Sequence, residues 1–455
     1  MVIADRMKHH LVASLFLGLS VPLMLFAQAP KPNIILILAD DLGFNDLSYY
    51  NKQDVKTPHI DALCRDGLRF DNFYANSPVC SPTRAALMTG RYPDAVGVPG
   101  LIRYPKADNW GYLKPDVPLM PAILKKYGYA TAIIGKWNLG LESPNLPNQK
   151  GFDYFHGWLE DMMEDYYDHR RHGINFMREN KQVIQPKGHA TDIFTEWAID
   201  YMNQATKKSR PFFLYLAYNA PHFPVQPPKQ WLDKVLARQP GIDPKRANLV
   251  ALIEHLDDGV GRLVQSLKQA GQYDNTLILF LSDNGGNLSD LASNQPYRDG
   301  KQSMYEGGLR IPAFVTWPAK IRRGSASNER LMTMDVLPTL EAIASGKTGR
   351  EYDGRSFSPV ILGSDEKLAE RPLYFVRREG GLKYGGKDYH ALIFQGWKLL
   401  QNTPYSPLEL YHLEQDPYEK VNLADKELAK VSALNNLMMM YVQRGGQTPW
   451  QKPEQ

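Results

Sequence analysis

The sequence predicts an α/β protein with a mostly parallel central sheet flanked by helices, and a smaller C-terminal α+β subdomain. Continuous apolar runs recur along the chain, and such runs are typical of parallel strands that are buried on both faces. Helical patterns lie between these runs, and the alternation favours a parallel sheet wrapped by helices. With 455 residues, of which 43% are hydrophobic, the chain can bury a large core.

The predicted elements alternate regularly in the first part of the chain. We expect buried strands at residues 33–39, 129–134, 211–218, 276–281 and 311–317. We expect helices at residues 57–66, 119–127, 191–205, 247–270 and 334–344.

The pattern changes after residue 345. Residues 345–371 are polar, rich in glycine and aperiodic. Short strand-like pieces follow at residues 373–376, 391–394, 397–400 and 408–413, and a helix is expected at 425–442. We therefore predict a catalytic domain at residues 30–365 and a C-terminal subdomain, with a small antiparallel sheet and a terminal helix, at residues 366–455.

The N-terminus has the pattern of an export signal. Arg6 and Lys8 precede an apolar stretch at residues 11–26, and Ala27-Gln28-Ala29 provides small residues at a cleavage site. The apolar stretch is short for a membrane span. We expect residues 1–29 to be a cleaved signal peptide, and the mature protein to be periplasmic or secreted and free of the membrane.

Charge and cysteine content exclude some classes of function. The net charge of +4 is small and no stripe of lysine and arginine stands out, which argues against a nucleic-acid partner. The chain has two cysteines, Cys64 and Cys80. Cys64 lies among Ile60, Leu63 and Leu68, so we predict a buried helix residue rather than a disulfide partner of Cys80.

Cys80 begins the most informative segment of the chain. Pro82 follows it closely, and proline is well tolerated in the first turn of a helix. Cys80 would then lie at a helix N-terminus, where free amides and the macrodipole favour an anion. Arg84, one turn later, lies on the same helix face, and Gly90 ends the apolar helical run. The segment therefore predicts a cradle for a negatively charged substrate group.

Two polar pairs directly follow predicted strands. Asp40 and Asp41 come after the first strand, and Asp283 and Asn284 come after residues 276–281. Ligands of open α/β sheets bind beyond the carboxyl ends of the strands, so we expect the two pairs to meet. Three carboxylates and an amide oxygen suit calcium or magnesium rather than zinc. Without a cation, these carboxylates would raise one another's pKa.

The Cys80 segment also resembles the signature of the type I sulfatases. Cys-x-Pro-x-Arg at residues 80–84 and Leu-Met-Thr-Gly-Arg at residues 87–91 match it, although Thr83 stands where serine is commoner. Further motifs occur in family order at residues 128–140, 220–224, 300–301 and 305–312, and C-terminal pieces match at 397–399, 409–411 and 416–417. The resemblance covers nearly the whole predicted mature chain and implies an alkaline phosphatase-like α/β fold.

The resemblance implies specific chemistry. Cys80 would be oxidised by a formylglycine-generating maturation enzyme, and the hydrated aldehyde of formylglycine would be the nucleophile. One calcium ion would lie beside residue 80, with a ligand set drawn from Asp40, Asp41, Cys80, Asp283 and Asn284. Cations aimed at the sulfonyl oxygens would come from Arg84, Lys136 and Lys301. His222 would protonate the departing alcohol, because its pKa is ordinarily near neutral.

Asn138 departs from the family pattern. Most members have a histidine there, which contacts a formylglycine hydroxyl and helps to expel sulfate by taking a proton. Asparagine can hydrogen-bond but is no base at ordinary pH. Either another group takes the proton, with Asp283 as a candidate, or turnover is slowed.

We predict an exported sulfatase that hydrolyses sulfate esters on a sulfated carbohydrate. Residues 157–189 offer tyrosines, acids and arginines for sugar hydroxyls and further sulfates, including Glu160 and Asp161. Other candidates for sugar binding are Arg103, Tyr104, Trp110 and Arg298. One alternative is a phosphate or phosphonate monoester hydrolase of the same superfamily, although the sequence lacks the extra histidines of a zinc pair. The other is a sulfated-glycan-binding protein with impaired turnover, which Asn138 suggests.

Overall fold

The computed structural model describes residues 30–452, except for 52, 209, 348, 365–366 and 381–385. The predicted signal peptide and the predicted domain boundary at residues 365 and 366 lie outside the described residues. Pro32–Gln455 form one compact unit. In the described part of the chain, no helix combines the length and the apolar character that a membrane span needs.

The described part of the chain contains a central sheet of ten strands. In spatial order these are β12 (Ser325–Met332), β2 (Leu68–Tyr74), β11 (Ala313–Thr316), β10 (Thr276–Ser282), β1 (Asn33–Ala39), β9 (Phe212–Ala217), β3 (Ala130–Lys136), β4 (Tyr154–Trp158), β7 (Met177–Glu179) and β8 (Gln182–Val183). The run from β10 to β4 is parallel throughout, which confirms the predicted mostly parallel α/β fold.

The register of the central strands places the polar pairs side by side. Every residue of β1 is buried, as its continuous apolar sequence predicts. Its last residue, Ala39, is paired with Ser282 at the end of β10. The next residue of each strand is an aspartate, so the register alone brings Asp40 and Asp283 to the same carboxyl edge of the sheet.

Several strands differ from the sequence prediction. The apolar run at residues 311–317 resembles the parallel strands in composition, but β11 is antiparallel to both β10 and β2. It is buried between two neighbours, so burial and composition carry no information on its direction. The sequence prediction missed β2, β4 and β12, because none of them forms one apolar run: β2 and β4 mix buried and partly exposed residues, and most of β12 is polar and at least partly exposed.

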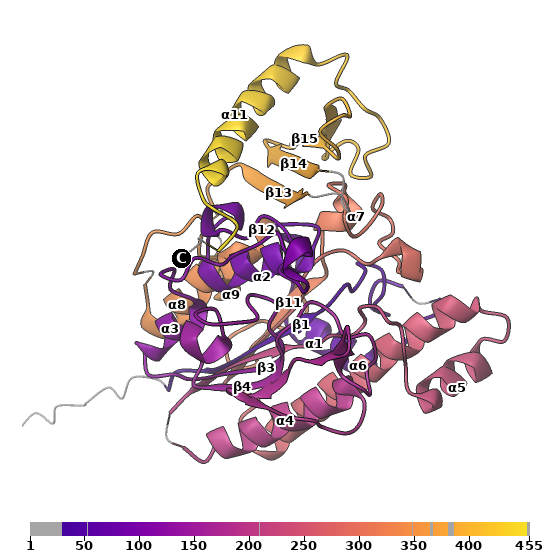
Figure 1. Ribbon diagram of the computed structural model, residues 1–455, viewed down its shortest axis with the longest axis vertical. Coiled ribbons are helices and arrows are strands. Elements are labelled where there is room, and N and C mark those ends of the chain that lie inside the picture. Colours follow the sequence, from indigo (N-terminus) through magenta and orange to yellow (C-terminus); the bar gives the residue numbers. More distant parts are fainter. Residues whose placement is uncertain are drawn as a thin grey trace, which may run out of the picture. The chain divides into compact units, whose positions relative to one another are not determined.

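Helices cover both faces of the sheet (Figure 1). One group of mutually packed helices comprises α1 (Pro58–Asp66), α4 (Ala190–Ala205), α5 (Lys229–Arg238) and α6 (Pro244–Gln269). The other comprises α2 (Cys80–Thr89), α3 (Met120–Lys125), α8 (Val336–Ser345) and α9 (Ser358–Ile361). The sequence predicted most of these helices within a few residues, but it missed α5, the four-residue α9 and the short α7 (Glu306–Leu309).

Short elements complete this part of the chain. A small hairpin is formed by β5 (Arg170–Arg171) and β6 (Ile174–Asn175). Single 3-10 turns occur at Asp94–Val96, Lys106–Asp108, Pro147–Lys150, Leu288–Asp290 and Thr333–Asp335.

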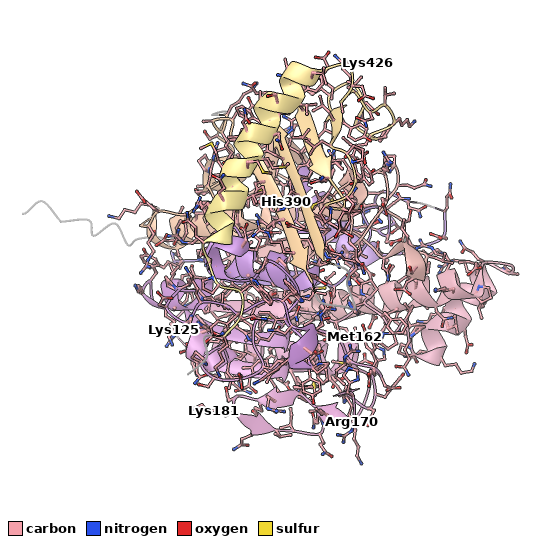
Figure 2. The ribbon with its side chains drawn as sticks, turned by 45° about the horizontal axis from the view of Figure 1, so that its top comes forward. Lys125, Met162, Arg170, Lys181, His390 and Lys426 are labelled. Carbon is pink, nitrogen blue, oxygen red and sulfur yellow. The ribbon has the colours of Figure 1, made fainter. Side chains whose placement is uncertain are left out.

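The predicted C-terminal antiparallel sheet is confirmed. Its strands pair in sequence order: β13 (Leu373–Glu379), β14 (Lys387–Phe394), β15 (Trp397–Gln401) and β16 (Glu409–His412). The last helix, α11 (Leu428–Gly446), packs against β14 and β15, and Figure 2 shows it beside the strand that carries His390. A second apolar core lies here and includes Ala86 of α2 and Leu309 of α7, so this sheet packs against the elements that carry the predicted site.

Candidate active site

The two polar pairs meet beyond the ends of β1 and β10. The backbone N–H of Asp41 donates to Asp283 Oδ1 at 3.2 Å, and Asn284 Nδ2 donates to Asp41 Oδ1 at 2.7 Å. Asp41 has a φ of 66°, a left-handed conformation that aspartate tolerates better than most residues. Gly285 follows, and a Cβ there would lie 1.8 Å from the Gly307 carbonyl oxygen, so only glycine permits this approach.

Cys80 is the first residue of α2, as predicted, and its side chain is fully buried. Its Sγ lies 3.3 Å from Asp40 Oδ1 and 3.8 Å from Lys301 Nζ. Burial raises the pKa of the Cys80 thiol well above its usual value, and the charges of Asp283 and Asp40 raise it further. A thiol attacks as the thiolate, so the unmodified cysteine is a poor nucleophile in this environment.

Three cations hold the three aspartates; Arg84 and Lys136 are buried, and Lys301 is partly buried. Arg84 donates to Asp283 Oδ2 from Nε at 3.1 Å and from Nη2 at 2.8 Å. Lys136 Nζ donates to Asp40 Oδ2, and Lys301 Nζ donates to Asp41 Oδ2, each at 2.7 Å. Cys80 and the three predicted cations therefore converge, since Arg84, Lys136 and Lys301 all reach this set of aspartates.

The aspartates differ in their electrostatic environment. Burial opposes ionisation of Asp40, but the charges of Lys136, His222 and Arg84 outweigh it and lower its pKa. Burial and the neighbouring charge of Asp40 raise the pKa of Asp283. Both oxygens of Asp283 already accept hydrogen bonds, from the Arg84 guanidinium and from the Asp41 N–H. This arrangement gives no support to Asp283 as the proton acceptor that replaces the family's histidine.

His222 faces the same cluster. Its Nδ1 lies 2.7 Å from the Phe223 carbonyl oxygen, so Nδ1 carries the proton that is donated there. Its Nε2 lies 3.6 Å from Asp41 Oδ2. With a proton on each ring nitrogen, His222 would donate its Nδ1–H to the Phe223 carbonyl oxygen and point its Nε2–H toward the aspartates.

The donor set fits a hard divalent cation. Potential ligand atoms of Asp40, Asp41, Cys80 and His222 lie within 4.8 Å of one another. Asn284 Oδ1 is buried beside them and has no hydrogen-bond partner among the described residues, which is unusual for an amide oxygen. Carboxylate and amide oxygens are the ligands that calcium prefers. The unpartnered oxygen is thus the structural observation that favours a bound cation.

Asn138 does not contact Cys80 through any hydrogen bond between described residues. Its Oδ1 accepts from Ser81 Oγ at 2.9 Å, and its Nδ2 donates to the Ile102 carbonyl oxygen at 2.8 Å. The Ile102 N–H in turn donates to Ser81 Oγ at 2.9 Å, which closes a ring of hydrogen bonds. Asn138 also has a left-handed φ of 54°. It therefore joins the first turn of α2 to the segment around residue 102.

The sequence prediction did not place Asp161 close to the predicted catalytic residues. The prediction named it only as one of many candidates for sugar binding, but its Oδ1 lies 3.6 Å from Lys136 Nζ. Asp161 comes shortly after β4, which pairs with β3 so that Trp158 is opposite Lys136. The available signal was an acidic pair after a strand, as at Asp40, but β4 itself was not predicted.

The other candidates for sugar binding are spread widely. In Figure 2, Arg170 lies at the lower rim, and Met162, the neighbour of Asp161, lies nearer the C-terminal sheet. Trp110 is stacked on Trp450. Arg298 packs over Tyr305 and donates to Tyr411 and Glu419, so the structure uses it at the C-terminal sheet.

A groove of about 780 Å³ adjoins the ring around Asn138, since Ile102 belongs to both. Its walls include Ile102, Arg103, Tyr104 and Leu139, which are continuous in sequence with the ring around Asn138. Arg103 is also one of the charges that act on Asp161. Two of the predicted candidates for sugar binding, Arg103 and Tyr104, therefore line the groove beside this ring.

Comparisons with known proteins agree on one family. Residues 32–346 match the family model described as sulfatase, and residues 297–443 match the model described as N-sulphoglucosamine sulphohydrolase, C-terminal. The N-acetylgalactosamine-6-sulfatase of Mus musculus is 30% identical, over 90% of this chain and 85% of that protein. Arylsulfatase A of Homo sapiens is 32% identical, over 90% and 86% respectively.

A solved structure gives the same result. The crystal structure of Ps i-CgsB in complex with k-i-k-neocarrahexaose superposes with a TM-score of 0.82. It is 32% identical in sequence, and the match covers 91% of this chain and 93% of that one.

Proposed function

Because the chain belongs to the sulfatase family, which hydrolyses sulfuric esters, we propose that it is an exported enzyme that removes sulfate from a sulfated carbohydrate. The observation that carries this proposal is the convergence of Cys80, three cations and three aspartates at one edge of the sheet. The names of the matched proteins support the substrate class, since one is a sulfatase of N-acetylgalactosamine and another was solved with an oligosaccharide.

Asp40, Asp41, Asp283 and Asn284 would hold one calcium ion, with residue 80 beside it. A bound calcium would neutralise charge on the sulfate group and on the aspartates. Without calcium, this region has more carboxylates than permanent cations. The carboxylates are those of Asp40, Asp41, Asp161 and Asp283, and the cations are Arg84, Lys136 and Lys301. A divalent cation reverses this balance, which favours an anionic substrate.

Residue 80 would serve as formylglycine, made by a maturation enzyme, and its hydrated aldehyde would supply the nucleophilic hydroxyl. The position supports this role because α2 directs its N-terminal amides toward residue 80, where they favour negative charge. The neutral, buried thiol supports it as well, because an unmodified Cys80 lacks the ionised form that would attack.

The chain's own residues would bind and orient the sulfate. Lys136 and Lys301 present ammonium groups close to residue 80: Lys136 Nζ donates to Asp40, which contacts Cys80, and Lys301 Nζ lies 3.8 Å from Cys80 Sγ. Such fixed cations stabilise charge on the sulfonyl oxygens as sulfur is attacked. Arg84 donates two hydrogen bonds to Asp283, so we infer that it fixes the position of Asp283 relative to α2 and also adds positive charge to the site.

His222 would donate a proton to the leaving alcohol. Its Nδ1–H is anchored on the Phe223 carbonyl, which fixes the ring so that Nε2 faces the cluster. A positioned donor of this kind lowers the barrier because the bridging oxygen gains negative charge as the ester bond breaks.

The test is sulfate release from a panel of sulfated mono- and oligosaccharides. The enzyme should be co-expressed with a formylglycine-generating enzyme, and peptide mass spectrometry should verify conversion of Cys80. We expect release from at least one sugar sulfate, and none from the Cys80→Ala variant. Matched phosphate esters provide the control for chemistry. Sugar binding by calorimetry without any release from converted enzyme would contradict the proposal.

The metal is tested separately on the same protein. We expect elemental analysis to find one calcium per chain, and activity to fall after chelation and to return when calcium is added back. Stoichiometric zinc in the active enzyme would contradict the proposed ligand set.

A further inference from the structure

Asp161 carries a buried carboxylate oxygen that has no hydrogen-bond partner among the described residues. The residue is only 6% exposed, and its ion pair with Lys136 is a long one, at 3.6 Å. The oxygen without a partner is Oδ1, the same atom that faces Lys136. Buried carboxylates ordinarily accept several hydrogen bonds, since burying a charge without them is costly. The missing donor of Asp161 therefore needs an explanation.

The neighbouring Glu160, by contrast, has a hydrogen-bond donor for each of its carboxylate oxygens. Its two oxygens accept from the backbone N–H of Tyr104, at 2.8 Å, and of Met162, at 2.9 Å. Both donors come from the chain itself. Glu160 thus ties the segment around residue 104 to the end of β4, while Asp161, one residue later, is left with acceptor capacity.

The charges around Asp161 belong to the site. Burial opposes its ionisation, but Lys136, Arg103, His222 and Lys301 together lower its pKa, so it is an anion at neutral pH. Lys136, Lys301 and His222 surround the proposed sulfate position, and Arg103 lines the groove. Asp161 is therefore close enough to interact with the charges at the proposed sulfate position and with Arg103 of the groove.

An anion at this place is unsuited to binding sulfate itself, because two negative charges repel. It is well suited to a neutral group that donates a hydrogen bond, and a sugar offers hydroxyls close to its sulfate ester. We propose that Asp161 accepts a hydrogen bond from a free hydroxyl of the sulfated sugar, and disfavours a sugar that carries a second sulfate at that hydroxyl. This inference rests on the proposed function and names a specificity-determining residue for it.

The experiment compares two variants on three substrates with formylglycine-containing enzyme. The substrates are the monosulfated sugar that the enzyme hydrolyses best, the same sugar with a second sulfate on a neighbouring hydroxyl, and 4-nitrophenyl sulfate, which has no hydroxyl. Asp161→Ala should lower kcat/KM on the monosulfated sugar by about tenfold or more relative to the aryl sulfate, because a hydrogen bond to a charged group is lost.

Asp161→Asn separates charge from hydrogen bonding. It keeps an acceptor oxygen, so it should retain more activity on the monosulfated sugar than Asp161→Ala and raise relative activity on the disulfated one. Asp233→Asn is the matched control: Asp233 lies on α5, outside the candidate sugar-binding residues, and its side chain is 55% exposed and pairs with Lys229. Its substrate ratios should equal those of the wild type. Thermal melts establish that every variant is folded.

The outcomes are distinct. An equal loss on sugar and aryl sulfates would show that Asp161 only positions Lys136, and no loss on either would show that water satisfies it; each overturns the inference and leaves the proposed function intact. Absence of sulfate release from every sugar by converted wild-type enzyme would overturn both.

Discussion

Two buried charge clusters of this molecule look alike in composition but differ in completeness. At the C-terminal sheet, Lys398 Nζ lies 2.9 Å from Glu306 Oε1 and 2.8 Å from Glu419 Oε1. Glu306 also receives Arg310 at 3.3 Å and the Tyr74 hydroxyl at 3.0 Å. The cluster at the ends of β1 and β10 also pairs aspartates with basic residues, yet Asn284 Oδ1 has no hydrogen-bond partner among the described residues and Asp161 Oδ1 lies 3.6 Å from Lys136 Nζ. Glu419 Oε1 likewise makes no hydrogen bond of good geometry among the described residues, but Lys398 Nζ is close to it, at 2.8 Å.

The difference separates a structural role from a functional one. Where the chain supplies both charges of each ion pair at short distance, the cluster is complete once the protein folds. Removing one of its charges should therefore lower the free energy of unfolding. Where polar atoms are buried without close partners in the chain, the desolvation cost of folding can be offset when a ligand binds them. We therefore expect substitutions in the first cluster to change unfolding, and substitutions in the second to change turnover.

The largest effect is expected from Asp283→Asn. The change removes a proposed metal ligand and the charge that faces the buried Arg84. We expect kcat/KM for sulfate release to fall by about 10³-fold, the size typical of losing a preorganised electrostatic group. Steady-state kinetics with enzyme verified for formylglycine provide the measurement. A variant with near wild-type turnover would show that the cluster at β1 and β10 is merely structural.

Glu306→Gln is the corresponding change in the cluster at the C-terminal sheet. It leaves Lys398 and Arg310 short of one buried negative charge. Breaking such a pair costs about 3 kcal/mol of unfolding free energy, while kcat of the folded protein should stay within about twofold. Denaturant unfolding and kinetics on the same preparation measure both. A loss of turnover at unchanged stability would erase the distinction between the two clusters.

The sequence predicts those active-site residues that follow fully buried strands. The apolar runs of β1 and β10 are unambiguous, so the pattern of residues alone is enough to place Asp40 and Asp283 together. By contrast, β4 is only partly buried and has no continuous apolar run, so the position of Asp161 beyond its end was not specified.

The ring around Asn138 was beyond sequence analysis for a different reason. Asn138, Ser81 and Ile102 come from separate segments, and their bonds depend on how loops without periodicity pass one another. The motif showed that Asn138 departs from the family pattern. It could not show that both polar atoms of its side chain are already engaged.

A third prediction concerns His189, another buried polar group with internal partners. Its Nδ1 accepts from the Thr191 N–H at the start of α4, and its Nε2 lies 2.9 Å from the Gln226 carbonyl oxygen. Only a neutral ring with the proton on Nε2 makes both bonds. Burial lowers the pKa of His189 to about 4, and the neighbouring His255 contributes in the same direction.

The sign of the effect on stability follows from this shift. Between about pH 6.5, the usual value for an unfolded histidine, and pH 4, the unfolded chain binds a proton that the folded chain resists. Stability should therefore fall as the pH falls through this range, with about 2 kcal/mol of the loss due to His189. His189→Asn keeps a helix-capping acceptor but cannot be protonated, so its stability should vary less with pH. An unchanged slope in pH-dependent thermal melts would contradict the assignment.

The smallest effect, and the one that tests the comparison most closely, is expected from Asn138→His. Asn138 has internal partners, like Lys398, but it lies in the functional region. A histidine would restore the family's usual residue, yet the larger ring must enter a fully buried position and disturb the bonds to Ser81 and Ile102. Because Ile102 also lines the groove, the disturbance should reach substrates that extend into it. We expect kcat/KM on a sugar sulfate to fall by about three- to tenfold more than on 4-nitrophenyl sulfate, the cost of about one hydrogen bond. A uniform gain on both substrates would instead mean that Asn138 occupies the place of a missing proton acceptor, and that a group with all its bonds inside the chain can still limit turnover.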